Sequence, residues 1–168
     1  ANRVSTHMSW QLLYQDKTWE DQEDKAIFNL AIVGTNFKKS RFDSSKAHNV
    51  SELGLAKDLV LDYWSKSVED SPRKTHRLPT FKNEVYENVM RGKWRDILEK
   101  SWYQGPAVPQ RSLAQTDQDN RQGVTPPPPD DTTSLLFLEQ HVNLDLDADG
   151  YAEPYIVTIE AASRAVIR

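Results

Sequence analysis

The chain has 168 residues, of which 38% are hydrophobic, and this is enough for one domain of ordinary size with a modest core. It has no cysteine, which excludes disulfides, thiolate metal sites and cysteine nucleophiles, and no apolar run approaches the roughly 20 residues that span a membrane. With 21 basic and 25 acidic side chains the net charge is −4, so a general attraction to nucleic acid is not expected and any contact with DNA would be local.

The first part of the chain predicts two helices. Apolar residues at helical spacing predict the first over residues 2–15, and a denser apolar stripe predicts the second over residues 19–33. Thr18 and Asp21 resemble a capping box at the start of the second helix, whose first turns are acidic, as the helix dipole favours. Gly34 is placed to terminate this helix.

The pattern then changes and predicts extended structure. Segments 36–43 and 49–55 have the composition of two antiparallel arms around a polar loop at 44–48. A solvated hairpin face explains the basic residues of this region. Segment 59–64 is expected to be a short apolar strand or a buried connector, and segment 73–79 is a polar extended piece ended by a proline.

A third helix is expected to begin at Thr80 or Asn83 and to end at Gly92. The tryptophans and aliphatic residues of 94–102 continue at helical spacing, which predicts a further short helix. A tryptophan stripe of this kind packs in a core far more often than it binds a ligand. We therefore expect a tryptophan-rich core.

Residues 104–134 are rich in proline, glutamine and aspartate and contain almost no large apolar side chain. Such a segment cannot bury enough surface to order itself, so we expect a mobile surface loop. It contains the run Pro126–Pro129, which favours the polyproline conformation. A spacer is the simpler role for this run, and a ligand for a proline-recognising partner is the alternative.

The end of the chain predicts a β-meander. Segments 136–144 and 155–159 are rich in β-branched and aromatic residues and are expected to pair through a tight turn. The last residues, 165–168, are expected to add a third strand. The predicted fold class is therefore α+β, in which helices pack with antiparallel β-hairpins and a C-terminal β-meander.

Composition divides the chain into a helical and hairpin part (1–103), a Pro/Gln/Asp-rich flexible loop (104–134) and the closing β-hairpin or meander (135–168). The sequence begins without methionine and stops inside a predicted strand. We therefore expect it to be part of a longer polypeptide.

The turn between the last two predicted strands has two interpretations. Asp145, Asp147 and Asp149, followed by Gly150, match the opening of the helix-loop-helix calcium motif. That motif requires a bidentate glutamate at its twelfth position, which is Ile156 here, and a helix in place of the strand that follows. We favour a hairpin turn in which the aspartates bond turn amides and the glycine supplies a positive φ. A small calcium-binding α+β module is the alternative.

The sequence predicts no active site. The four histidines lie on unrelated segments, and none has a serine or carboxylate at a spacing that nucleophilic catalysis uses. There is no glycine-rich phosphate loop. We expect a protein that is not an enzyme and needs no cofactor. A hydrolase whose site is assembled from distant residues is a further hypothesis, motivated only by the histidines.

Several phrases of the chain stand out in order: Ala1–Tyr14 (ANRVSTHMSWQLLY), Ala31–Gly34 (AIVG), Asn49–Glu52 (NVSE), Ala56–Val60 (AKDLV) with Asp62–Trp64 (DYW), Pro72–Pro79 (PRKTHRLP) and Asp145–Thr158 (DLDADGYAEPYIVT). Together they resemble the portal proteins of tailed bacteriophages of the short-tailed type. The resemblance covers nearly the whole chain except the Pro-rich loop at 104–134, whose role it leaves open.

The resemblance implies a structural head-to-tail connector that assembles as a ring, usually of twelve subunits, at one vertex of the virion capsid. Double-stranded DNA passes through its axis during packaging and ejection. The ring contacts the capsid protein and docks the terminase and later the head-completion and tail proteins, and it is assembled in the host cytoplasm. The segment lacks the long helices of a stem and so resembles part of the N-terminal wing. The family offers no catalytic residue, and the resemblance implies no contact with a membrane.

The basic segment that includes Arg73, Lys74 and Arg77 is the best candidate for an interaction surface, with a neighbouring subunit, the capsid protein or DNA as its partner. A solvated strand is the simpler interpretation of these residues.

Overall fold

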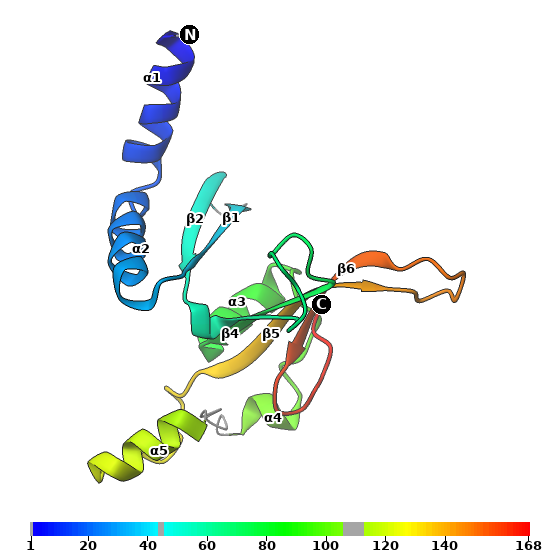
Figure 1. Ribbon diagram of the computed structural model, residues 1–168. Helices are drawn as coiled ribbons and strands as arrows, with labels where there is room; N and C mark the ends of the chain where they lie inside the picture. Colours follow the sequence, from blue (N-terminus) through cyan, green and yellow to red (C-terminus); the bar gives the residue numbers. More distant parts are fainter. Residues whose placement is uncertain (1, 44–45, 106–112) are drawn as a thin grey trace. The chain divides into compact units, whose positions relative to one another are not determined.

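The computed structural model describes residues 2–43, 46–105 and 113–168 (Figure 1). The fold is α+β, as expected, with one two-stranded and one four-stranded antiparallel sheet among these residues. The chain forms two compact units, residues 1–59 and 60–168, which we describe separately. This boundary differs from the division by composition because strands on both sides of the Pro-rich segment pair in one sheet.

The first unit opens with three consecutive helical segments: α1 (Asn2–Trp10), the π-helical turn η1 (Gln11–Gln15) and α2 (Trp19–Val33). The predicted helix over 2–15 therefore forms, with its second half as a wider turn. Gly34 ends α2 as predicted. It has φ 82, in the left-handed region that glycine adopts without a Cβ clash, and its N–H bonds the Leu30 carbonyl at 2.9 Å.

The predicted capping box at Thr18 is wrong. Thr18 has helical backbone angles, and its side chain makes no cap hydrogen bond. Its hydroxyl instead donates to Asp16 Oδ1 at 2.7 Å, and its N–H donates to the same oxygen at 3.1 Å. The carboxylate two residues upstream competes successfully for the threonine, because an aspartate bonds readily to the backbone two residues on.

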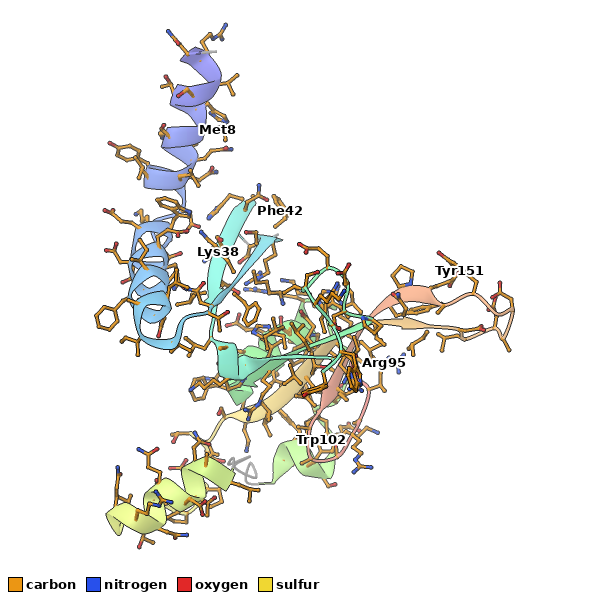
Figure 2. The ribbon with its side chains drawn as sticks, viewed as in Figure 1. Met8, Lys38, Phe42, Arg95, Trp102 and Tyr151 are labelled. Atoms are coloured by element: carbon orange, nitrogen blue, oxygen red, sulfur yellow. The ribbon has the colours of Figure 1, made fainter. Side chains whose placement is uncertain are left out.

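The predicted hairpin is confirmed as strands β1 (Phe37–Asp43) and β2 (His48–Gly54), which pair antiparallel. Part of its loop, residues 44–45, lies outside the described residues. Three contacts join the hairpin to α2: the Leu53 N–H donates to Gln22 Oε1 at 3.0 Å, Lys38 forms an ion pair with Glu23, and Lys38 Nζ lies 5.5 Å from the Trp19 ring centre. Figure 2 shows Lys38 and Phe42 on β1. A short 3₁₀ turn, Ala56–Asp58, follows β2.

The second unit is built on a four-stranded sheet in the order β3-β4-β5-β6. Its strands are β3 (Leu59–Leu61), β4 (Arg73–Thr80), β5 (Leu135–Leu144) and β6 (Glu153–Glu160). The β5–β6 hairpin that the sequence predicts is present, and β4, which precedes the Pro-rich segment, pairs antiparallel with the other edge of β5.

The last residues pair with β6 but do not form the predicted third strand of the meander. Ile159 and Val166 make an isolated antiparallel bridge, and the Glu160 N–H donates to the Ala165 carbonyl at 2.9 Å. The Ile167 N–H donates to the Thr158 carbonyl at 2.7 Å. The chain is turned here by Arg164, whose φ of 58 interrupts the extended backbone that a longer strand needs.

One face of the sheet carries the core, which helix α3 (Lys82–Met90) covers. Trp94 and Trp102 pack against this core as expected, with ring centres 4.7 and 6.4 Å from that of Phe137. The buried apolar residues of the cluster are Val85, Ile97, Leu135, Phe137 and Ile167.

The helix predicted over 94–102 is wrong in most of its length. Only α4 (Ser101–Gln104) is helical, and the residues before it form turns. The Arg95 N–H donates to the Ile167 carbonyl at 3.0 Å, so this backbone bonds to the C-terminal segment instead of to itself. Helix α3 begins after Phe81, whose N–H bonds Glu84 Oε2, and Gly92 follows its end with φ 66.

The Pro-rich segment is not wholly a loop. Helix α5 (Leu113–Gln122) forms within it, although none of its residues is buried. The sequence argument rested on the lack of apolar surface, whereas a run of residues without Pro or Gly can still form a local helix. Residues 106–112 lie outside the described part of the chain, and the Pro126–Pro129 run is exposed and forms neither helix nor strand. No helix among the described residues is long and apolar enough to cross a membrane.

Candidate functional site

The acidic turn between β5 and β6 is organised by its own aspartates. Asp145 accepts hydrogen bonds from the backbone N–H groups of Asp149, at 3.2 Å, and Gly150, at 2.9 Å. Asp149 Oδ1 accepts from the Tyr151 N–H at 2.7 Å. Gly150 has φ 90, the positive value expected of it. The aspartates therefore bond turn amides, as the hairpin interpretation predicts.

The same three carboxylates are the one group among the described residues with metal-ligand spacing. Asp145, Asp147 and Asp149 each offer an oxygen, and these oxygens lie within 4.8 Å of one another on an exposed turn. Calcium requires six to eight oxygen ligands. Ile156, at the position of the motif's glutamate, lies in β6 with an apolar side chain. The turn amides already bond both oxygens of Asp145.

The basic segment forms β4, and the strand divides its charges between the two faces of the sheet. Alternation along a strand places Arg73 and Arg77 on one face and Lys74 on the other. Lys74 Nζ donates to the Glu69 carbonyl at 3.3 Å, and only Arg73 of the three is exposed. The three residues therefore do not present one continuous basic surface.

One histidine has a carboxylate partner that the sequence did not reveal. His141 Nε2 lies 3.2 Å from Glu139 Oε1, two residues earlier on β5. The strand register places His76 opposite Glu139 and Lys74 opposite His141, on the same face of the sheet. Such an i, i+2 pair is invisible to motif searches because it depends on strand geometry.

A groove of about 510 Å³ lies in the first unit, between η1, the start of α2 and the β1–β2 hairpin. Its apolar walls include Leu12, Trp19 and Phe42. Arg41 also lines it, with its guanidinium 2.7 Å from Glu52 Oε1. The groove is open and can accept an apolar side chain.

Asp16 lines the same groove and is buried. Burial opposes its ionisation, but hydrogen bonds from Thr18 and from the Ser51 backbone outweigh this, and the pKa of the Asp16 carboxyl is held below its ordinary value. The carboxylate is thus a fixed negative charge that joins the η1–α2 junction to β2.

Helix α2 has the most unusual surface of the described chain, because its mostly polar side faces the hairpin and its apolar side is exposed. Its half-buried residues, at helical spacing toward the hairpin, are mostly polar: Trp19, Gln22, Glu23, Ala26 and Asn29. Its exposed side carries large apolar residues over the last two turns, with these exposed fractions: Ile27 66%, Phe28 69%, Leu30 50%, Ile32 68% and Val33 56%. We call this the outer face of α2, together with the exposed acids Glu20, Asp21 and Asp24 that precede it.

The α1–η1 segment also exposes apolar side chains. No residue of α1 is buried, and α1 runs directly into η1. Met8, labelled in Figure 2, is 55% exposed, and Trp10 is 49% exposed. Large exposed apolar surfaces on folded proteins are typical of sites that contact another molecule or segment.

Sequence reasoning missed the outer face of α2, although a signal was present. From Ala26 to Val33 the apolar residues surround the helix instead of forming one stripe. A helix that is apolar on all sides is normally buried on all sides. The prediction of a single core-facing stripe therefore hid the need for a second partner.

No protein-family model matches the chain, and a search of curated proteins finds no similar one. The Asp145 turn, the β4 strand and the outer face of α2 are the candidate surfaces.

Proposed function

We propose that the chain is part of a portal subunit, the head-to-tail connector that forms a ring at one capsid vertex of a tailed bacteriophage. The ordered phrases listed above, from Ala1–Tyr14 to Asp145–Thr158, support this proposal. The α+β composition of the chain, with hairpins and short helices, agrees with a segment of the wing. In this role the chain is a structural component and not an enzyme.

The observation that carries the proposal is the exposed apolar surface of α1, η1 and α2. A subunit that works alone would leave these side chains in water at a cost of roughly 25 cal/mol for each Å² of apolar area. The cost is avoided if another protein surface covers them. A ring of identical subunits supplies such a surface at every position, because each subunit has a neighbour on both sides.

The proposal assigns the partners in a defined way. Copies of the chain are the lateral neighbours, in a ring of about twelve if the portal plan holds. Capsid protein, terminase and tail proteins meet the full ring, and double-stranded DNA passes along its axis. The net charge of −4 agrees with a passage that does not hold DNA tightly.

Electron microscopy of the purified protein, in the longest form that can be produced, tests the proposal. We expect rings with a central channel, and sedimentation velocity should show one large species whose amount rises with concentration. A protein that remains monomeric at the highest concentration, with no ring in the images, would overturn the proposal.

A further inference from the structure

The α1–η1 segment and the outer face of α2 share an order of side chains. Each begins with polar and charged residues and ends with large apolar ones. Residues 2–15 contain Arg3 and His7 and no acidic residue, whereas the first two turns of α2 expose Glu20, Asp21 and Asp24 and a single base, Lys25, which bonds Asp21 at 2.6 Å. Two helical surfaces with matching order and opposite charge are complementary when they lie parallel.

A single alignment of the two helical surfaces matches both their side-chain order and their charges. If Arg3 lies beside Glu20, the same parallel alignment places His7 beside Asp24 and Trp10 beside Ile27. Residues three and four apart on a helix share a face, so Arg3, His7 and Trp10 form one stripe. Glu20, Asp24 and Ile27 have the same spacing and form the matching stripe on α2. Trp10 and Ile27 are 49% and 66% exposed.

The two helices of one copy cannot make this parallel contact. Only Asp16, Lys17 and Thr18 connect them, and three residues span at most about 10 Å. For the two helices of one copy to lie parallel, the connection would have to run back along the whole length of η1 and α1, which rise about 1.5 Å for each helical residue. In Figure 1 α1 continues away from α2 and does not fold back along it. An antiparallel return would place Arg3 beside Val33, where the outer face has no charge.

We propose that the α1–η1 segment of one copy docks in parallel on the outer face of α2 of a second copy. This inference rests on the proposed ring function and names the contact that links neighbouring subunits. The contact is heterologous, since a donor surface on one copy meets a different acceptor surface on the next. Such contacts close into rings when the rotation between copies permits it.

Cysteine crosslinking tests the contact directly, because the chain has no cysteine of its own. The alignment places Trp10 beside Ile27 on the two facing stripes, and the variant Trp10→Cys with Ile27→Cys keeps Arg3, His7, Glu20 and Asp24. Under mild oxidation we expect this double variant to form a covalent ladder of dimers, trimers and larger species on a denaturing gel. A disulfide requires Cα atoms about 4.4–6.8 Å apart, so the ladder reports close approach.

Two controls set the specificity of the result. A mixture of the Trp10→Cys and Ile27→Cys single variants should give a mixed dimer and no ladder, while Ile27→Cys alone should give at most a trace of dimer. The pair Trp10→Cys with Val33→Cys, which this alignment keeps six residues or about 9 Å apart along the helix axis, should not crosslink above that trace. A ladder from this displaced pair, or none from the Trp10/Ile27 pair, would overturn the inference.

The outcomes also separate this inference from the proposed function. Rings in the electron microscope without a Trp10–Ile27 ladder leave the portal proposal standing and reject the helix contact. A ladder without rings under any condition supports the contact and rejects the portal proposal.

Discussion

The rings of Trp94 and Phe137 lie with their centres 4.7 Å apart at an angle of 50°, in the middle of the second unit's core. Phe137 is fully buried on β5, and Trp102 contacts it from α4. We expect Phe137→Ala to lower the free energy of unfolding by about 3–5 kcal/mol, because it removes a large buried side chain and leaves a cavity. Urea denaturation followed by tryptophan fluorescence measures this change.

Tyr63→Ala is the matched control for this substitution, since it also truncates an aromatic ring but one that is 88% exposed. Its effect should stay within about 0.5 kcal/mol. Equal losses for Phe137→Ala and Tyr63→Ala would show that the core of the second unit lies elsewhere.

Asp16 should make the first unit sensitive to acid. Its pKa is lowered in the folded protein, since hydrogen bonds from Thr18 and Ser51 outweigh the effect of burial. A carboxyl with a lowered folded-state pKa contributes stability above its unfolded pKa of about 3.9 and loses it as pH falls through the folded value. We expect Asp16→Ala to cost about 1 kcal/mol at neutral pH, because it removes the acceptor of the hydrogen bonds from Thr18 and Ser51.

The measurement is urea denaturation of wild type and Asp16→Asn at a series of pH values from neutral to strongly acidic. The difference between the two proteins should be constant above about pH 4 and shrink below it. Asp117→Asn, at an exposed aspartate of α5, is the control and should change little. A difference between wild type and Asp16→Asn that does not change with pH would contradict the role of the Asp16 charge.

The turn between β5 and β6 should depend on Asp145 more than on calcium. Asp145→Ala removes the acceptor for two amides and should cost about 1 kcal/mol, whereas Asp147→Ala should cost less. We expect isothermal titration with calcium to give no saturable heat, since three exposed carboxylates fall short of the ligand number that calcium needs. A saturable heat that disappears in Asp147→Ala would instead establish a calcium site.

The outer face of α2 should contribute to association and little to folding. Phe28→Ser changes a side chain that is 69% exposed, so the free energy of unfolding of a monomer should shift by no more than about 0.5 kcal/mol. Sedimentation velocity should nevertheless show weaker self-association than in wild type. Tyr63→Ala, an exposed aromatic outside the helix, should leave self-association unchanged. A loss of stability without a change in association would place Phe28 in the core of its own unit.

The sequence predicted the elements whose signals are local. Helix α2, the β1–β2 hairpin and the β5–β6 hairpin follow from periodicity and from turn residues such as Gly34 and Gly150, which act on their own neighbours. The turns that replace a helix at residues 94–100 could not be predicted in this way. There the Arg95 N–H bonds the Ile167 carbonyl, a partner from the other end of the chain, and this long-range bond overrides the local helical spacing.

The candidate surfaces also differ in whether their geometry depends on local sequence or on the whole fold. The geometry of the Asp145 turn is contained in a few consecutive residues and was predicted. The division of Arg73, Lys74 and Arg77 between two faces depends on β4 becoming a strand of the sheet. The outer face of α2 was missed because polar residues such as Gln22 and Asn29 face the hairpin, and only the folded unit shows which side of a helix is covered.

The pairing of β4 with β5 also determines where this protein can be altered most freely. The chain leaves the sheet at Thr80 and returns to it at Leu135, and the exposed Pro126–Pro129 run lies on that path. The entropy cost of closing a loop grows only with the logarithm of its length, about 0.6 kcal/mol for each doubling. A tag or a small folded domain inserted within this run should therefore lie on the surface. It should change the stability of the β4–β5 pairing little.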